Sequence, residues 1–338
     1  MPSAADDVRR AIDASGGRLP FDRFVATALY GTHGFYNVAG RAGRRGDFLT
    51  SPEVGPLFGT VVARALDSWW DELGRPDPFT VVEAGAGPGT LARAVLAASP
   101  RCISAMRYLA VEVSAAQRSL HPTGVESREM MPTDSFDGVI LANELLDNLP
   151  FRLFVFDGGW REAFVATDGE RFVERLFDTR EVPNCLARSA PHGARVAVLD
   201  AARTWVDTAL SILNSGRLVV VDYCTTSESM AVRPWREWLR TYAGHQRGAH
   251  YLSAVGEQDV TVEVAIDQLP APTEMSAQAE FLREHGLDSL VEEGKMAWQS
   301  AAALPTVAAM TMRSRIREAE ALCDPRGLGG FSVLQWRR

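Results

Sequence analysis

The residues best suited to chemistry lie directly after a short apolar run. Residues 139–142 are all apolar and are predicted to form a buried strand, and the next six positions carry two acids and two amides, namely Asn143, Glu144, Asp147 and Asn148. Carboxylates can hold a cation such as a guanidinium and can favour loss of its proton as a new bond forms. The alternative is structural, because Asn143 or Asp147 could cap the next helix. Both interpretations stay open on the sequence alone.

A second candidate site is a glycine-rich loop between a predicted strand and a predicted helix. In 81-VVEAGAGPGTLARAVL-96 three glycines follow the strand at alternate positions, namely Gly85, Gly87 and Gly89. Glycines allow the backbone to turn tightly and to approach a ligand, and the N–H groups at a helix start add a partial positive charge. Glu112 ends the next predicted strand, 23 residues after Gly89, where an acid can pair with ribose hydroxyls. The loop therefore predicts a cofactor site.

The spacing of the glycines distinguishes between the cofactor classes that use such a loop. A Walker A motif is excluded because no Gly-Lys-Ser/Thr follows, and the dinucleotide spacing GxGxxG is excluded because the glycines read GxGxG. An acid, Glu83, stands two residues before the first glycine. This E-x-GxGxG form resembles motif I of the class I S-adenosylmethionine (SAM) methyltransferases, in which the acid organises the loop near the sulfonium end of SAM. The alternative is a tight strand–helix turn that binds no ligand.

Strands alternating with helices are predicted around both candidate sites. Short apolar runs separated by helical segments predict an α/β fold with a mostly parallel, doubly wound sheet, whose strands include Phe79–Glu83, Tyr108–Glu112, Phe136–Ala142 and Gly216–Tyr223. In a class I (Rossmann-like) methyltransferase the strand that ends at Ala142 is the fourth, and it lies beside the cofactor strand. Ligands of open α/β sheets bind at the carboxyl ends of the strands, so both candidate sites are expected at one crevice.

Two additions to this core are predicted. Residues 1–75 are expected to form an N-terminal helical cap with a Gly/Arg-rich lid loop, followed by a helix that has Ser51 as its N-cap and Pro52 in its first turn. Residues 76–338 are expected to form the core, with an insertion at about 151–195 that opens with a hairpin around Asp157-Gly158-Gly159.

The C-terminal third is expected to be mostly helical. The predicted helices are 278–286, 289–303 and 306–322, and a strand is predicted at 331–337.

Composition and charge exclude several classes of protein. The 338 residues are 46% hydrophobic and 23% charged, and their formal net charge of −8 argues against a nucleic-acid-binding surface. An acidic protein can still attract a cationic substrate. No apolar run approaches the length of a membrane span, the N-terminus lacks the apolar segment of a signal peptide, and the four cysteines and six histidines show no metal-ligand spacing. We therefore expect a cytoplasmic protein that uses no metal.

Several segments together resemble the MidA family of SAM-dependent methyltransferases. They are 34-GFYNVAGRAGRRGDFLTSPEVGPLFG-59, the glycine loop at 82–93, 142-ANELLDNLPFRLF-154, the strand end VVVDY at 219–223, 256-GEQDVTVEVAIDQL-269 and 278-QAEFLREHGL-287. The family includes the mitochondrial arginine methyltransferase that assists assembly of respiratory complex I. The GRRGDFLTSPE element is far more specific than the glycine loop. Two positions depart from the family pattern, because relatives usually have Gly where Cys224 stands and often have His where Glu263 stands.

The resemblance implies a class I fold with additional N-terminal and inserted parts, SAM as the cofactor, and ω-N-methylation of protein arginine. It also implies that the GDFLTSPE segment closes over the cofactor. The residues near the cofactor would then include, besides the glycine loop and Glu112, the lid residues Asp47, Thr50, Ser51 and Glu53. The candidate catalytic residues are Asn143, Glu144, Asp147 and Asp222.

The sequence leaves the methyl acceptor open. A protein or peptide arginine is the leading expectation, and a small molecule or natural product is the alternative acceptor. A further alternative is an assembly factor that binds SAM without turnover, although such a protein has no need of Glu144 and Asp147 at the crevice. We expect no nucleic-acid partner and no membrane, and a homodimer stays open.

Overall fold

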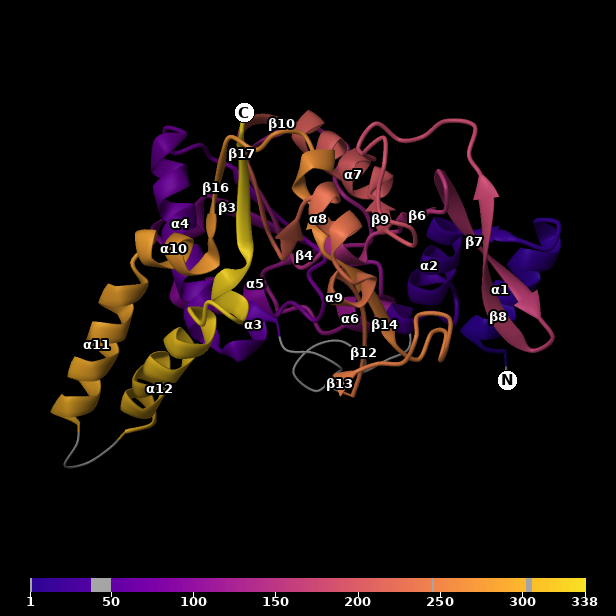
Figure 1. The fold of residues 1–338 in the computed structure, drawn as a ribbon. Coiled ribbons are helices and arrows are strands. Elements are labelled where there is room, and N and C mark those ends of the chain that lie inside the picture. The colour runs from indigo at the N-terminus through magenta and orange to yellow at the C-terminus, as the bar shows by residue number, and fades with distance from the viewer. Residues whose placement is uncertain (1, 38–49, 245, 302–305) are drawn as a thin grey trace. The chain divides into compact units, whose positions relative to one another are not determined.

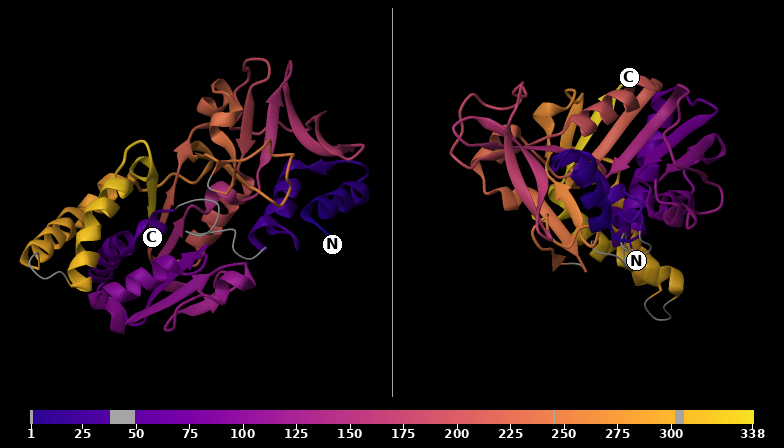
Figure 2. Two further views of the ribbon diagram at one scale, coloured as in Figure 1. Left: turned by 90° about the horizontal axis from the view of Figure 1, so that it is seen from below. Right: turned by 90° about the vertical axis from the view of Figure 1, so that its right-hand side faces the viewer.

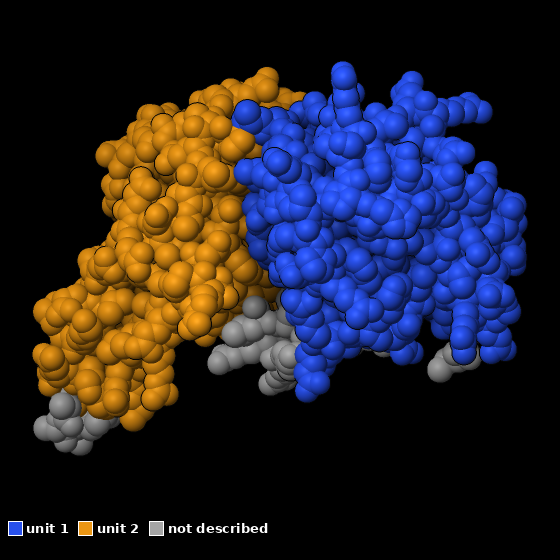
Figure 3. Space-filling view, in the orientation of Figure 1, with its two compact units in different colours: residues 1–48, 145–208, 223–271 blue, residues 49–144, 209–222, 272–338 orange. Residues whose placement is uncertain are grey.

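The computed structural model describes residues 2–37, 50–244, 246–301 and 306–338. Contacts divide the chain into two compact units, which Figure 3 shows in different colours. Unit 1 comprises Met1–Phe48, Leu145–Thr208 and Tyr223–Ala271, and unit 2 comprises Leu49–Glu144, Ala209–Asp222 and Pro272–Arg338. These units are discontinuous in sequence and do not follow a boundary at residue 75. Units defined by contacts and domains defined by function are different divisions, so the predicted cap and core stay a prediction.

The centre of unit 2 is a seven-stranded sheet with the order β16-β17-β10-β5-β2-β3-β4 (Figure 1). Five neighbouring strands are parallel: β10 (Leu213–Asp222), β5 (Phe136–Asn143), β2 (Phe79–Ala84), β3 (Met106–Val111) and β4 (Glu126–Arg128). At one end of the sheet, β17 (Ser332–Arg337) and the edge strand β16 (Glu274–Ala277) are antiparallel to their neighbours. The predicted class I α/β fold is confirmed, as is the place of the strand 136–143 beside the cofactor strand.

The core of unit 2 lies between this sheet and the long helix α4 (Pro56–Glu72). Buried side chains of α4 such as Phe58 and Trp69 belong to one apolar cluster with Val81 of β2 and Val139 of β5. All six residues of β2 are buried, as expected for a central strand of a covered parallel sheet. The helix α5 (Thr90–Ala98) adds Leu91 and Val95 to the same cluster. This packing fixes the strand ends that carry the candidate site.

The other helices of unit 2 are shorter or peripheral. They are α3 (Ser51–Val54), α6 (Ala115–Arg118), α10 (Gln278–Glu284), α11 (Leu287–Ser300) and α12 (Val307–Leu322), together with the 3₁₀ turns η2 (Arg101–Ser104) and η5 (Leu328–Gly330). Figures 1 and 2 show α11 and α12 side by side.

The predicted start of the long helix after the lid loop is wrong in two respects. The N-cap of α3 is Thr50 instead of Ser51, because the Ser51 side chain is buried and its hydroxyl donates a hydrogen bond to Gln278 Oε1 at 2.8 Å. The single predicted helix is also two helices. Gly55 separates them in an extended conformation, and Pro56 begins α4, where a proline lacks only an N–H that would be unsatisfied anyway.

Unit 1 begins with two helices and a meander of strands. Its helices are α1 (Ala4–Ala14) and α2 (Phe21–Tyr30), and its five-stranded sheet contains β1 (Leu19–Pro20), β6 (Arg152–Phe156), β7 (Trp160–Asp168), β8 (Arg171–Asp178) and β9 (Arg195–Val198). Strands β6 and β7 are antiparallel neighbours joined at Asp157–Gly159, so the predicted hairpin is confirmed. The strand β8, which pairs with β7, is an addition that the sequence did not indicate.

The remaining elements of unit 1 are short. Strands β12 (Leu239–Ala243), β13 (Gln246–Arg247) and β14 (Asp259–Val262) form an antiparallel sheet, and β11 (Cys224–Thr225) pairs with β15 (Val264–Ala265). The other elements there are α8 (Ser227–Val232), α9 (Trp235–Trp238) and the turns η1 (Phe35–Asn37), η3 (Leu146–Asn148) and η4 (Ile266–Gln268). Helix α7 (Asp200–Ser211) includes residues of both units. Within the described ranges, none of the helices has the length and apolarity needed to cross a bilayer.

Candidate active site

The glycine loop connects β2 to α5 with a backbone that glycine alone adopts readily. Gly85, Gly87 and Gly89 have φ angles of 69°, 52° and 77°, in the left-handed region. A Cβ added to Gly89 would lie 3.0 Å from Pro122, so a side chain there would require Pro122 to move by a few tenths of an ångström. A Cβ on Gly87 would meet only Gln117 Oε1, at 3.5 Å. The backbone of Gly87 is therefore open to an approaching ligand.

Glu112 is joined to this loop by hydrogen bonds. The Gly87 N–H donates to Glu112 Oε2 at 3.0 Å, and the Ser114 N–H donates to Oε1 at 2.8 Å. A carboxylate offers about four lone-pair positions, so these two bonds leave acceptor capacity for the hydroxyls of a ribose. The structure thus brings Glu112 and the glycine loop together, and contact of Glu112 with a ribose stays a prediction.

Glu83 lies on β2 with its side chain inside the protein. The Tyr108 hydroxyl donates a hydrogen bond to Glu83 Oε2 at 2.7 Å. Burial raises the pKa of Glu83 from 4.5 to about 7, although the hydrogen bond from Tyr108 favours the ionised form. Glu83 is therefore held by a side chain of β3, two residues before the first glycine of the loop.

Asn143 and Glu144 end β5 at the same edge of the sheet. Asn143 Nδ2 donates to Glu144 Oε1 at 3.1 Å, and the Glu144 N–H donates to Val221 O at 2.8 Å. Glu144 has a φ of 50°, which is uncommon for a residue with a side chain and turns the chain sharply at the strand end. Within the described residues, the buried Asn143 Oδ1 accepts no hydrogen bond, so it is an acceptor available to a bound molecule. Asp222, fully buried, ends the neighbouring strand β10.

These strand ends form the place where open α/β sheets bind ligands. The chain runs from β2 outward to β3 and β4, and then returns to β5 on the other side of β2. The crevice at such a reversal lies at the carboxyl ends of the strands. In unit 2 the glycine loop, Glu112, Asn143 and Glu144 all lie at that edge.

The lid residues have different surroundings. Glu53 Oε1 accepts a hydrogen bond of 2.7 Å from Thr90 Oγ1, directly after the glycine loop. Thr50 is at the N-cap of α3, and Ser51 is buried against Gln278. Asp47 lies outside the described residues. Of this group, the structure brings Glu53 to the loop, and contact of the others with a cofactor stays a prediction.

Asp147 belongs to unit 1, where it is part of a buried network of side chains. Its Oδ2 accepts hydrogen bonds from the hydroxyls of Tyr223 and Thr261. Burial raises the pKa of Asp147, and the bonds from Thr261 and Tyr223 oppose this increase. A carboxyl with a raised pKa is better able to take up a proton than an exposed one.

A second buried acid, Asp259, was not singled out from the sequence. It accepts hydrogen bonds of 3.1 Å from the Tyr36 hydroxyl and from Asn148 Nδ2. Burial, followed by the charge of Asp147, raises the pKa of Asp259 to about 7. The quoted segment 256–269 contains this residue, but nothing in its local spacing indicates that it meets Asn148 and Tyr36. The described residues include no group of three or more His, Cys, Asp and Glu side chains placed to hold a metal ion.

Comparison with known proteins decides which cofactor suits this edge. A family model of S-adenosyl-L-methionine-dependent methyltransferases matches residues 61–284, which is most of the chain. The chain belongs to this family. The match covers β2, β3, β5 and β10 with the glycine loop and Glu112.

Relatives with curated names are similar to parts of the chain. A mitochondrial protein arginine methyltransferase NDUFAF7 homologue from Drosophila melanogaster is 43% identical over 88 residues, which are 26% of this chain and 20% of that protein. The mouse protein arginine methyltransferase NDUFAF7 is 25% identical over 313 residues, which are 75% of this chain and 67% of that protein. The alignments thus span from a fifth to about two thirds of these relatives' own lengths, and the resemblance to the MidA family is confirmed.

Solved structures show the same fold over nearly the whole chain. A COG1565 superfamily protein from Burkholderia thailandensis, crystallised with S-adenosyl-homocysteine, has a TM-score of 0.83 at 25% identity and covers 99% of this chain and 92% of its own. A native crystal structure of a COG1565 superfamily protein from the same organism has a TM-score of 0.79. This methyltransferase is therefore SAM-dependent, and SAM is its cofactor.

Proposed function

We propose that this methyltransferase transfers the methyl group of SAM to an arginine side chain of a protein or peptide. The observation that carries the proposal is the pair of acids in the segment 142–150, Glu144 at the end of β5 and the buried Asp147. The names of the NDUFAF7 relatives agree with an arginine acceptor. Carboxylates suit this acceptor because a carboxylate can accept two parallel hydrogen bonds from a guanidinium in a bidentate pair.

We assign one role to the cofactor-binding residues and another to the acids of the segment 142–150. Gly85, Gly87, Gly89 and Glu112, supported by Glu83, hold SAM, and Asp47, Thr50, Ser51 and Glu53 belong to the lid that closes over it. SAM supplies an electrophilic methyl group on a sulfonium. Glu144 and Asp147 orient the guanidinium so that one nitrogen points its electron pair at that methyl group.

Proton removal is the second task of the acids. When the new N–C bond forms, the S–C bond breaks, its electron pair stays on sulfur, and the methylated nitrogen must lose one proton. Asp147 takes up this proton, since burial has already raised its pKa. Asn143 and Asp222 complete the proposed catalytic set at the ends of β5 and β10.

Labelled SAM tests the proposal directly. The protein is incubated with methyl-labelled SAM and with cell lysate, and mass spectrometry then identifies what carries the label. We expect label on arginine side chains of a polypeptide. Label on a small molecule would show that the methyl acceptor is a small molecule instead of an arginine side chain. SAM binding without any labelled product would indicate an assembly factor that does not turn SAM over. We further propose that the enzyme works in the cytoplasm, because its four cysteines are far apart in the sequence and form no CxxC pair.

A further inference from the structure

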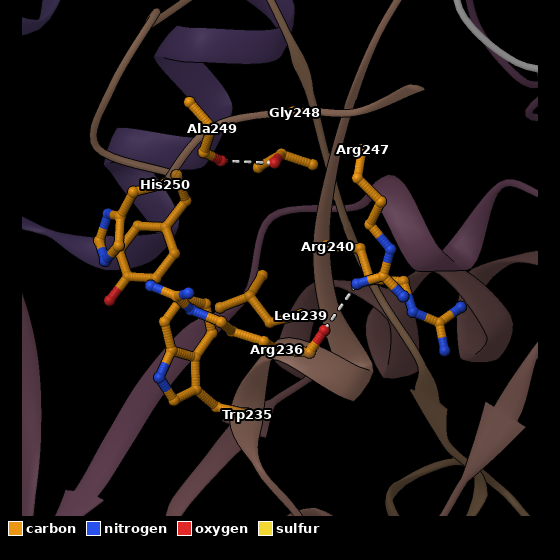
Figure 4. A pocket seen from close by; sticks show the side chains of 10 residues that line it. Trp235, Arg236, Leu239, Arg240, Arg247, Gly248, Ala249 and His250 are labelled. Atoms are coloured by element: carbon orange, nitrogen blue, oxygen red, sulfur yellow. Dashed lines mark hydrogen bonds between the residues drawn. The ribbon is translucent and has the colours of Figure 1, made fainter. Parts of the chain in front are cut away.

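Unit 1 contains a pocket whose lining includes none of the proposed cofactor-binding or catalytic residues. It has a volume of about 350 Å³ and is formed by the helix α9, the strands β12 and β13 and the segment that follows them. Its lining side chains include Trp235, Arg236, Arg240, Arg247 and Tyr251. In the view of Figure 4, Trp235 and His250 lie on one side, and Arg240 and Arg247 on the other. The volume is that of a site for a small ligand or for one or two side chains.

The pocket carries more positive than negative charge. Arg240 shares a carboxylate with a second arginine, because Glu263 forms ion pairs with both Arg240 and Arg233, the latter at 2.6 Å. One positive charge of this group is therefore not compensated by Glu263. Arg236 and Arg247 form no ion pair with any acid in the described part of the chain, and Arg247 donates only to the backbone oxygen of Arg236, at 2.9 Å. Within the described residues, Arg236 and Arg247 thus place two positive charges without a carboxylate partner at this pocket, although the formal net charge of the chain is −8. They make this pocket a local attractor of anions.

Aromatic rings form the other wall. The Arg236 guanidinium lies 5.1 Å from the centre of the Trp235 ring, and the rings of His250 and Tyr251 approach Trp235 edge-on at 5.5 and 5.3 Å. Tyr251 is fixed from behind, because its hydroxyl donates to Glu174 Oε2 at 2.6 Å. This wall is therefore rigid and can contact a flat or apolar group beside an anion.

We infer that this pocket binds an oxyanion, either a carboxylate or a phosphate, attached to a flat or apolar group. Arg236 and Arg247 pair with the oxyanion, and the Trp235 wall contacts the attached group. The shared chemistry has two sources, an acidic segment of a polypeptide or a free small anion. The pocket is also connected to the buried acids of unit 1, because Arg240 lies 5.6 Å from the ring of Tyr223, whose hydroxyl donates to Asp147. The binding itself does not depend on arginine being the methyl acceptor.

Binding of two defined probes to the full-length protein tests this inference. One probe is a fluorescent hexapeptide of alternating glutamate and tyrosine, measured by anisotropy beside its glutamine counterpart. The other is phenyl phosphate, measured by calorimetry. The double variant Arg236→Gln/Arg247→Gln removes the charges at exposed positions. Arg313→Gln is the matched control, since Arg313 is also an exposed arginine stacked on a tryptophan, at 4.3 Å from Trp298 in unit 2.

The expected result is binding that the double variant weakens at least tenfold, that Arg313→Gln leaves unchanged, and that falls with increasing salt. Preference for the glutamate peptide over both other probes assigns the pocket to an acidic polypeptide, and preference for phenyl phosphate assigns it to a small anion. Unchanged SAM affinity in the double variant shows that the chain is folded. The inference is overturned if neither probe binds, if the glutamine peptide binds as well as every anion, or if the double variant binds like the parent.

Discussion

Replacing Glu83 by glutamine should make the protein more stable at neutral pH. The carboxyl of Glu83 is buried on β2, and its pKa is raised from 4.5 to about 7 by desolvation. Between these two values the folded chain keeps a proton that the unfolded chain has released. The free energy of unfolding therefore falls as pH rises through this interval. The stabilisation from this group is complete below pH 4.5 and lost above pH 7.

The size of the effect follows from the interval between the two pKa values. At about 1.4 kcal/mol for each pH step of one, the interval corresponds to roughly 3 kcal/mol. Glutamine does not titrate and can still accept the hydrogen bond from Tyr108. The free energy of unfolding of Glu83→Gln, minus that of the parent, should therefore increase by roughly 3 kcal/mol between pH 4.5 and 8.

Urea unfolding followed by circular dichroism at a series of pH values measures this difference. Glu126→Gln is a suitable control, since Glu126 lies in the same sheet but is partly exposed, and hydrogen bonds from Arg128 and Arg107 lower its pKa. Its difference curve should have the opposite sign and lie at lower pH. A flat curve for Glu83→Gln from pH 4.5 to 8 would show that Glu83 is ionised in the folded protein, and our account of its burial would be wrong.

Other substitutions test the site itself. Gly87→Val should abolish detectable SAM binding in calorimetry, and Gly87→Ala should weaken it. The reason is that a Cβ would enter the open space beside a backbone with a φ of 52°. Binding of NAD instead of SAM would refute the assignment of the cofactor site. Glu112→Gln should weaken SAM binding by about 1–3 kcal/mol, and unchanged affinity would exclude a bond from Glu112 to the ribose. Glu144→Gln and Asp147→Asn should each reduce the single-turnover rate by about a hundredfold or more, with nearly unchanged SAM affinity. If Asp147 only caps a turn, Asp147→Asn would instead lose about 1 kcal/mol of stability at an unchanged rate.

The parallel sheet could be predicted from the sequence because its strands are long apolar runs. β2, β5 and β10 are buried along almost their whole length, so their composition alone distinguishes them from exposed segments. Helices between them follow from the need for a crossover between parallel neighbours. The proximity of Glu112 to the glycine loop could be predicted for a similar reason, since both belong to one strand–helix–strand unit.

The elements that were missed are short and depend on distant partners. β11 and β15 have two residues each, which is too few for a periodic pattern. The break of the helix at Gly55 has a similar origin. Ser51 is a good N-cap by its type, but Gln278 takes its hydroxyl from more than two hundred positions away. Local preference was overridden by a contact that no local pattern contains.

The surroundings of the acids in the candidate site could not be predicted from their own sequence segment. Glu144 and Asp147 are three positions apart, yet Glu144 belongs to unit 2 and Asp147 to unit 1. The surroundings of Asp147 come from Tyr223 and Thr261, and those of the second acid, Asp259, come from Tyr36 and Asn148. The sequence indicated Asp147 as a candidate acid, and its place beside the cofactor stays a prediction. Its raised pKa could not be predicted, because burial is a property of the folded unit.

The two departures from the family pattern have different physical meanings. Cys224 stands where relatives usually have glycine, but it pairs in a short strand and has no positive φ, so this chain does not require glycine there. Glu263 stands where relatives often have histidine, and it accepts hydrogen bonds from both Arg233 and Arg240. A neutral histidine has one acceptor nitrogen and a charged one has none, so histidine could not satisfy two guanidiniums. A substitution of Glu263 would therefore leave both arginines without this acceptor. Because Arg240 also lines the pocket formed by α9, β12 and β13, a change at Glu263 alters the charge of that pocket.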